Sequence, residues 1–236
     1  MKSATARHSP ASAAPGGQPD GVEIQEKISA AARDLFLAEG VEAVTIRSIA
    51  RRAGCSVGLL YHYFESKEDL LAHLLANTFA RLNARLRRQA GSHAAPAARL
   101  RAVLAAYVRF GLDHPHDYEL LFAARNPEQH PHLMQVFRTQ GMACYDAILG
   151  CCEQCARAGL LARGPGAAEE VAQVLWAGCH GLVHLLNTAR EFPFQARERL
   201  LKSHVEVLIR GALDGRHGGK ARKIASALNT VQSKLV

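Results

Sequence analysis

The chain has 236 residues, and 48% of them are hydrophobic, enough to bury a core without disulfides or metal ions. Its 29 Lys and Arg against 21 Asp and Glu give a formal net charge of +8, which fits a polyanionic partner but also a basic protein without one. The most apolar window, residues 171–186, is interrupted by polar side chains and is too short to cross a bilayer, so no membrane segment is expected.

The first 21 residues combine Ala, Pro, Gly and Ser and contain no apolar run of the kind that a secretion signal needs. We therefore expect a disordered leader over residues 1–21. Six cysteines in a long chain without a secretion signal indicate reduced thiols rather than a disulfide framework. These features together predict a cytoplasmic protein.

Three short helices are predicted next. In the first, residues 24–38, apolar side chains recur at the spacing of an amphipathic helix. Thr45 can cap a second helix, Gly54 allows a tight turn, and Ser56 can cap a third helix. Two short helices that meet at a glycine turn are the pattern of a helix-turn-helix, here residues 45–64.

A long helix is predicted after this motif. Ser66, with Asp69 three residues later, resembles a capping box and opens a helix that reaches about Gln89. Helical periodicity and breakers then alternate, which predicts helices over residues 97–113, 117–125, 131–158, 167–190 and 195–213. No stretch reads as a strand, so the predicted fold class is all-α. The last segment, residues 215–236, is Gly-rich and then basic, and we expect a loosely attached tail.

Three runs in chain order carry a family resemblance: AARDLFLAEG, TIRSIARRAG and SVGLLYHYFESKEDLL. Together they resemble the N-terminal DNA-binding domain of TetR-family transcriptional regulators, over residues 22–82. The resemblance implies a homodimer that binds double-stranded operator DNA through the helix-turn-helix. It also implies that residues 97–214 form a helical ligand-binding and dimerisation domain.

The resemblance also assigns DNA contacts by position. Phosphate contacts are implied for Thr45, Tyr61, His62 and Lys67. Base-edge contacts are implied for Arg47, Ser56, Val57, Gly58 and Leu59. Many relatives carry polar or basic side chains where this chain has Val57 and Leu59. We therefore expect base discrimination to depend on Arg47 and on contacts with thymine methyl groups.

Net charge does not mark the N-terminal region as a DNA binder. Residues 22–70 contain six basic and eight acidic side chains, so affinity must come from the placement of a few cations and helix N-termini. Residues 71–109, by contrast, hold seven arginines and no acid. This Arg-rich segment, whose arginines lie within 81–109, has two interpretations: contact with the flanking DNA backbone, or a solvated face, which is the expected one.

One motif stands out in the second half. The run LWAGCHGLVHLL resembles the WHG-type C-terminal domain of a subset of TetR-family regulators. Trp176 and His180 share a helix face, a spacing that core packing explains as well as a ligand pocket does. Candidate pocket residues are the aromatic and soft side chains of Tyr107, Phe110, Phe122, Met134, Phe137, Met142, Trp176 and His180. The last two predicted helices are expected to form a four-helix bundle with their symmetry mates.

The resemblance implies a repressor that leaves its operator when a small, apolar ligand binds, with no enzymatic activity and no metal or cofactor. Two alternatives stay open. A redox or metal sensor could use four cysteines that lie mostly on one helical face, Cys144, Cys151, Cys152 and Cys155. A helical metalloenzyme could use His180 and His184, although Gly181 stands where a zinc protease needs Glu.

Overall fold

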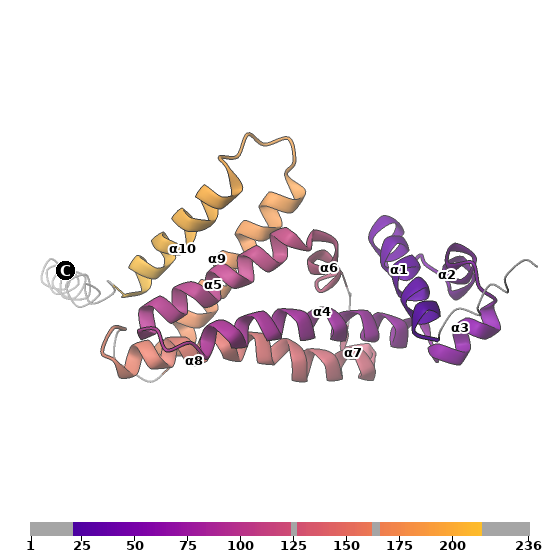
Figure 1. Cartoon of the computed structure of the whole chain (residues 1–236), viewed down its shortest axis with the longest axis horizontal. Coiled ribbons are helices and arrows are strands. Elements are labelled where there is room, and N and C mark those ends of the chain that lie inside the picture. Colours follow the sequence, from indigo (N-terminus) through magenta and orange to yellow (C-terminus); the bar gives the residue numbers. More distant parts are fainter. Residues whose placement is uncertain (1–20, 124–126, 162–165, 214–236) are drawn as a thin grey trace, which may run out of the picture.

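The computed structural model describes residues 21–123, 127–161 and 166–213. The predicted tail (215–236) and all but the last residue of the predicted leader (1–21) lie outside these ranges. Every regular element within the described residues is a helix, which confirms the all-α class. The molecule is elongated, with α1, α2 and α3 at one end, α6 and α7 near the middle, and α5, α8, α9 and α10 towards the other end (Figure 1).

Three short helices form the first end: α1 (Gly21–Glu39), α2 (Ile46–Ala53) and α3 (Val57–Tyr63). Their apolar side chains recur every three or four residues, so each helix has one face that must be covered. A small shared core covers these faces and consists of the buried side chains Ile28, Phe36, Ile49, Leu60 and Phe64. The predicted helix boundaries are confirmed here to within a few residues.

A long helix, α4 (Lys67–Ala90), connects this end to the rest of the molecule. Ser66 caps it as predicted, because the Ser66 hydroxyl accepts a hydrogen bond from the Asp69 backbone N–H at 3.0 Å. Its apolar stripe is buried from Leu70 to Leu86. α4 contacts α1 near its start and packs on α5 and α8 further along, so it belongs to both parts.

Three later helices begin with a proline: α5 (Pro96–Asp113), α6 (Pro115–Leu120) and α7 (Pro131–Val136). Proline suits this position because the first N–H groups of a helix have no intrahelical partner and the proline φ is already helical. The prediction of a helix over 117–125 is therefore wrong in its boundaries. The helix begins at Pro115 and ends at Leu120.

The continuous helix predicted over 131–158 is also wrong in detail. α7 runs into a π-helical segment (Phe137–Gly141), and α8 (Met142–Arg157) follows it. A wider helical turn frees a backbone carbonyl from its usual partner. The buried Asn83 of α4 binds this segment, since its amide nitrogen donates to the Gln140 carbonyl at 2.9 Å.

The last two helices, α9 (Ala167–Thr188) and α10 (Arg197–Leu213), pack closely on each other and on α5. Gly178 permits the approach, because a Cβ at that position would lie 3.0 Å from the Leu208 side chain. His204 Nε2 also lies 3.0 Å from the Gly178 carbonyl. The two helices predicted at the end of the chain are thus confirmed.

Candidate DNA interface and ligand site

Local hydrogen bonds hold α2 and α3 in a fixed relation. The Thr45 hydroxyl accepts from the Ser48 N–H, and the Ser48 hydroxyl accepts from the Thr45 N–H, both at 3.1 Å. Gly54 ends α2 in the left-handed conformation with φ of 70°. The Ser56 hydroxyl accepts from the Leu59 N–H at 3.1 Å and caps α3. The caps and the glycine turn predicted from the sequence are therefore all present.

Most of the residues expected to contact DNA are exposed. Thr45, Arg47, Ser56, Gly58 and His62 are exposed, and Tyr61 is 52% exposed although it is aromatic. The two apolar residues, Val57 and Leu59, are partly buried, and Val57 packs against the core. The start of α3 therefore presents a mainly small and apolar surface.

Lys67 has a contact within the protein that the sequence does not reveal. Its ammonium group donates to the Val41 carbonyl at 2.8 Å and lies 3.5 Å from the Glu42 carbonyl. These bonds tie the start of α4 to the segment between α1 and α2. A phosphate contact from Lys67 stays a prediction, beside this structural role.

A second cation accompanies Arg47 on α2. Arg51 lies one helical turn further on, and neither guanidinium makes an ion pair or side-chain hydrogen bond within the described residues. The next arginine, Arg52, pairs with Asp34 of α1 at 3.2 Å. Sequence reasoning missed Arg51, although its i, i+4 spacing from Arg47 is a sufficient signal.

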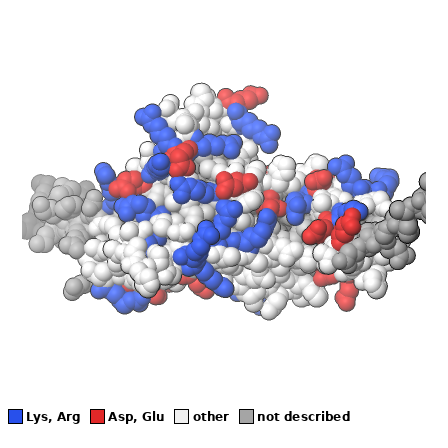
Figure 2. All heavy atoms as spheres, in the orientation of Figure 1, with Lys and Arg blue, Asp and Glu red and all other residues white. Residues whose placement is uncertain are grey.

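The Arg-rich segment (71–109) is largely engaged inside the molecule. Arg85 pairs with Asp113 at 3.1 Å, Arg101 with Glu206 at 3.0 Å, and Arg109 with Glu198 at 2.6 Å. Two further arginines also have partners: Arg81 with Asp117, and Arg99 with Gln154. Figure 2 shows the mixture, with blue Lys and Arg side chains next to red Asp and Glu over the middle of this face. These partners leave few arginines of the segment free to bind DNA, and the choice between the two interpretations stays a prediction.

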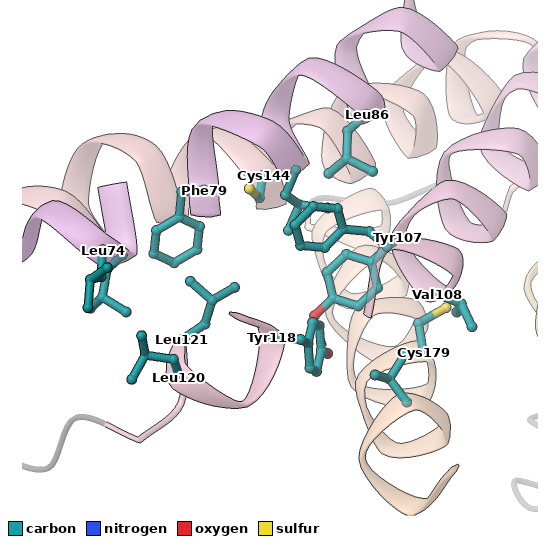
Figure 3. Close-up of a cluster of buried hydrophobic side chains, with 14 of the residues drawn as sticks. Leu74, Phe79, Leu86, Tyr107, Val108, Tyr118, Leu120, Leu121, Cys144 and Cys179 are labelled. Carbon is teal, nitrogen blue, oxygen red and sulfur yellow. The ribbon is translucent and has the colours of Figure 1, made fainter. Parts of the chain in front are cut away.

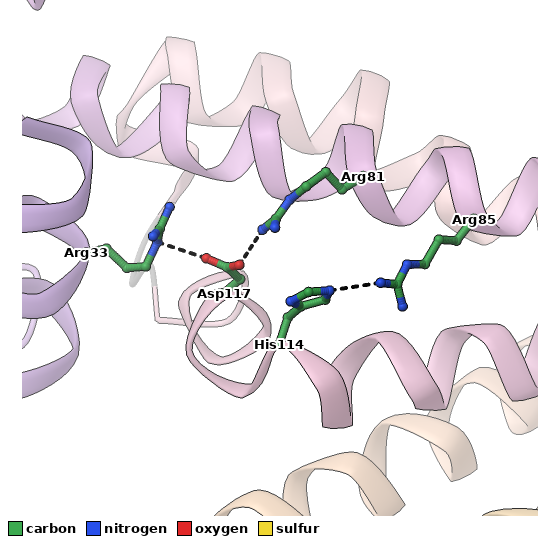
Figure 4. Close-up of polar contacts among 5 residues, drawn as sticks. All are labelled: Arg33, Arg81, Arg85, His114 and Asp117. Carbon is green, nitrogen blue, oxygen red and sulfur yellow. Dashed lines mark hydrogen bonds and ion pairs between the residues drawn. The ribbon is translucent and has the colours of Figure 1, made fainter. Parts of the chain in front are cut away.

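The acidic partner of Arg81, Asp117, also contacts the helix-turn-helix end of the molecule. Asp117 of α6 is 9% exposed and receives two arginines, Arg33 from α1 and Arg81 from α4 (Figure 4). Arg33 Nε forms an ion pair with Asp117 Oδ1 at 2.8 Å. α6 is thus tied directly to α1.

The residue after Asp117 enters a chain of four polar aromatic side chains, here called the aromatic relay. Trp176 Nε1 donates to the Tyr107 hydroxyl at 3.1 Å, and that hydroxyl lies 2.8 Å from the Tyr118 hydroxyl. Tyr118 in turn lies 2.8 Å from His180 Nδ1. Figure 3 shows Tyr107 and Tyr118 with their rings edge to face between α5, α6 and α9.

Burial shapes the charge states of the aromatic relay. Desolvation raises the pKa of both Tyr107 and Tyr118, so both phenols are neutral. Desolvation, and then the nearby His184, lower the pKa of His180 below its usual 6.5. All four side chains of the relay are therefore uncharged near neutral pH.

Four of the eight predicted pocket residues come together around the aromatic relay. Tyr107, Trp176 and His180 belong to it, and the Phe122 ring centroid lies 4.3 Å from that of His180. Sequence reasoning missed Tyr118, whose ring centroid lies 5.2 Å from that of Phe122 although Phe122 follows the end of α6.

The other predicted pocket residues differ in their surroundings. Phe110 is fully buried and lies beneath the guanidinium groups of Arg81 and Arg85. Phe137 packs edge to face on Phe79 of α4, with 5.8 Å between ring centroids. Met134 is partly buried and Met142 is 48% exposed. A pocket role for these residues stays a prediction.

The thiol and metal alternatives find little support. All four α8 cysteines are buried, and burial raises the pKa of Cys144 and of Cys152 to about 12, which disfavours the reactive thiolate. Within the described residues no group of three or more His, Cys, Asp or Glu side chains is placed to hold a metal ion. The His180 and His184 rings lie 6.2 Å apart between centroids, without a third ligand.

None of the described helices is both long enough and apolar enough to cross a membrane.

Relatives of known sequence match mainly the N-terminal part. The chain is 46% identical over 61 residues to the HTH-type transcriptional repressor KstR of Mycobacterium tuberculosis. It is 44% identical over 71 residues to the HTH-type transcriptional regulator BetI of Burkholderia mallei. These alignments cover 26% and 28% of this chain, and 28% and 35% of the relatives. The chain thus spans about a third of the length of these curated relatives.

Solved structures match over most of the chain. A bacterial regulatory protein of the tetR family from Rhodococcus RHA1 superposes with a TM-score of 0.67 at 21% identity, covering 80% of this chain and 96% of that one. PfmR, a TetR-family transcriptional regulator from Thermus thermophilus, gives a TM-score of 0.65 at 16% identity, covering 78% and 97%. These likenesses establish the fold.

Two family profiles cover both ends of this architecture. The profile described as bacterial regulatory proteins, tetR family, matches residues 28–74. The profile described as tetracyclin repressor-like, C-terminal domain, matches residues 100–208. The WHG subtype remains a prediction. The chain belongs to the TetR family of bacterial regulatory proteins.

Proposed function

We propose that the protein is a DNA-binding transcriptional regulator, a homodimeric repressor that a small, apolar molecule releases from its operator. One observation carries the proposal: α2 and α3 are fixed by caps and a glycine turn, yet their outer face holds the exposed Arg47 and Tyr61 without partners among the described side chains. Exposed, rigidly held groups at the end of an elongated molecule suit contact with a second macromolecule. The names of KstR and BetI agree with this role.

In this proposal α3 enters the major groove with its first turn. Ser56 and Gly58 bring the backbone close to the bases, and Val57 and Leu59 meet thymine methyl groups. Arg47 and Arg51 of α2 lie beside the groove, where a guanidinium can bind guanine or phosphate. Thr45, Tyr61 and His62 would set the register through the phosphates.

Dimerisation would use the outer faces of α9 and α10. Three large apolar side chains are exposed there: Val174 is 60%, Leu185 51% and Val207 69% exposed. An isologous four-helix bundle of α9, α10 and their symmetry mates would bury them and place two α3 helices on one DNA duplex. Val207→Glu should shift sedimentation toward the monomer, whereas Val22→Glu, at an exposed apolar position on α1, should not.

The response to the effector would pass through α6. Asp117 and Tyr118 are neighbours in the chain, but Asp117 binds Arg33 of α1 while Tyr118 belongs to the aromatic relay. A ligand that changes the position of Tyr118 must also move Asp117, because both lie on the same short helix. Such a ligand would favour one arrangement of α1 relative to α4 by its differential affinity for the two states.

A gel shift with duplex DNA from upstream of the gene that encodes the protein tests the function. We expect salt-sensitive binding that is lost in the Arg47→Ala, Tyr61→Ala double variant. Arg88→Ala is the control, because Arg88 of α4 is exposed and has no ion pair within the described residues. If the double variant binds as tightly as the control, the assignment of the DNA interface is wrong.

A further inference from the structure

We propose that the effector presents a neutral carbonyl oxygen to His180 Nε2 and rests its apolar, ring-bearing body against Phe122 and Trp176. The inference rests on the ligand-responsive function proposed above and adds the chemical class of the ligand. It follows from the direction of hydrogen bonding that gives both buried tyrosine hydroxyls of the aromatic relay an acceptor within the described residues.

The direction is set by the tryptophan. An indole N–H can only donate, so Tyr107 accepts from Trp176 at 3.1 Å. The Tyr107 proton then goes to the Tyr118 oxygen 2.8 Å away, and the Tyr118 proton goes to His180 Nδ1, also at 2.8 Å. In a neutral imidazole that accepts at Nδ1, the proton resides on Nε2. Four side chains thus fix one histidine tautomer.

The reverse direction of hydrogen bonding leaves one tyrosine hydroxyl proton without an acceptor. If His180 Nδ1 donated to Tyr118, the contact between Tyr107 and Tyr118 could use the proton of only one hydroxyl. The other tyrosine proton would then have no acceptor among the described residues. Tyr107 is only 2% exposed and Tyr118 3%, so water does not readily replace the lost bond. Leaving a buried hydroxyl unpaired is costly, and the first direction prevails.

His180 Nε2–H is open to a ligand. The His180 side chain is only partly buried, and its Nε2 has no hydrogen-bond partner within the described part of the chain. Nε2 is not a buried atom, so a ligand can reach it at the surface of the cluster. A donor held at one tautomer and left unpaired selects an acceptor group.

The neighbours of His180 favour a neutral acceptor with an apolar body. The Phe122 ring lies 4.3 Å away between centroids, Trp176 6.5 Å and His184 6.2 Å. Phe122 is 48% and Trp176 37% exposed, so both offer ring surface to a ligand. The groups hydrogen-bonded in the aromatic relay carry no charge, so a carboxylate at His180 Nε2 would lose hydration in exchange for a hydrogen bond from a neutral donor. A ketone or a similar neutral carbonyl compound meets these conditions.

The tautomer can be read directly. In the full chain labelled with ¹⁵N at histidine, the ring nitrogen shifts of His180, assigned by their loss in His180→Gln, should report a proton on Nε2 and none on Nδ1 above neutral pH. Tyr118→Phe removes the donor to Nδ1 and should shift His180 toward a mixture of tautomers. A proton on Nδ1 in the unsubstituted protein would overturn the proposal.

Ligand class can be tested with three matched probes. Cyclohexyl phenyl ketone, cyclohexylphenylmethane and cyclohexyl(phenyl)acetate share the same two rings and differ in the polar group. The chain has one tryptophan, Trp176, so its fluorescence reports on the aromatic relay. We expect the ketone to bind about tenfold more tightly than either of the others. The ketone accepts a hydrogen bond from His180, the hydrocarbon leaves that donor unpaired, and the carboxylate loses its hydration. His180→Leu should remove the advantage over the hydrocarbon, and Tyr118→Phe should reduce it.

Equal affinity for ketone and hydrocarbon, or a preference for the carboxylate, would overturn the inference. The same protein preparation is examined by gel shift, so the two proposals fail separately. Operator binding without ketone selectivity refutes the ligand class and leaves the regulator intact. Ketone selectivity without any DNA binding refutes the proposed function and leaves the chemistry of the His180 site.

Discussion

Replacing Arg33 with glutamine tests the connection between the aromatic relay and the helix-turn-helix. The substitution removes the cation that α1 contributes to Asp117, while Arg81 continues to neutralise that carboxylate. The Arg33 side chain is 33% and the Asp117 side chain 12% exposed, so the pair lies between a surface pair and a buried one. Exposed pairs contribute about 0–1 kcal/mol and loss of a buried partner costs about 3–5 kcal/mol, so about 1 kcal/mol is expected with Arg81 still present.

The effect should appear in the response to effector rather than in folding. A contact worth about 1 kcal/mol in one of two states changes their ratio about fivefold. With a duplex selected from random sequences and a ligand identified by thermal shift, fluorescence anisotropy gives the Kd for DNA with and without ligand. We expect the ratio of the two Kd values to fall about fivefold in Arg33→Gln. The melting temperature should fall by only about 2–4 °C.

Arg52→Gln is the matched control. Arg52 forms the other pair between an arginine and an aspartate in this part of the molecule, with Asp34 of α1 at 3.2 Å, but both side chains are more than half exposed. Its loss should leave the ratio of Kd values unchanged. A full ligand response in Arg33→Gln, or an equal loss in Arg52→Gln, would refute the role of α6 in coupling.

Three further predictions concern the pKa of His180, the thiols and the glycine turn. Because burial lowers the pKa of folded His180, the unfolded chain binds more protons below the ordinary value of about 6.5, and the free energy of unfolding should fall there with falling pH. Urea denaturation at several pH values should show a smaller fall in His180→Gln, and an identical fall would contradict the assignment. Cys55 is partly exposed whereas the other five cysteines are buried, so dithionitrobenzoate should modify Cys55 first. Rapid labelling of α8 thiols in the native protein would revive the redox alternative. Gly54→Ala should lower the free energy of unfolding by about 1 kcal/mol, since φ is 70° there while a Cβ meets nothing within 4 Å. Thermal denaturation of Gly54→Ala measures this loss of stability. An unchanged melting temperature would contradict the prediction and would mean that the turn relaxes to negative φ.

The features predicted correctly from the sequence depend on neighbours in the chain. Thr45, Gly54, Ser56 and Ser66 act on backbone groups within three or four residues, so their roles follow from local chemistry alone. The apolar periodicity that defines the long helices is local in the same sense. The boundaries of α6 failed because proline was treated only as a stop, although it also suits the first position of a helix.

Apart from Arg51, whose signal was local, the features missed depend on residues far apart in the chain. Tyr118 and His180 are 62 residues apart, and Arg101 and Glu206 are 105 apart. No local sequence pattern predicts these contacts, because they depend on how α5, α6, α9 and α10 pack. The same applies to the Arg-rich segment, which contains no acid of its own and takes its partners from other helices.

The distribution of these ion pairs changes the meaning of the net charge of +8. Arginines that already pair with Asp or Glu inside the protein release few counterions from DNA, so the salt dependence should reflect only the free cations near α3. Arg47 and Arg51 provide two such cations in each protomer, which predicts a slope of log K against log salt of about −4 for a dimer. Anisotropy titrations over a range of potassium chloride concentrations measure this slope. A value near −10 would mean that the Arg-rich segment leaves its acidic partners and binds the DNA backbone, whereas a value near −4 that halves in Arg51→Ala would confine the electrostatic contact to α2.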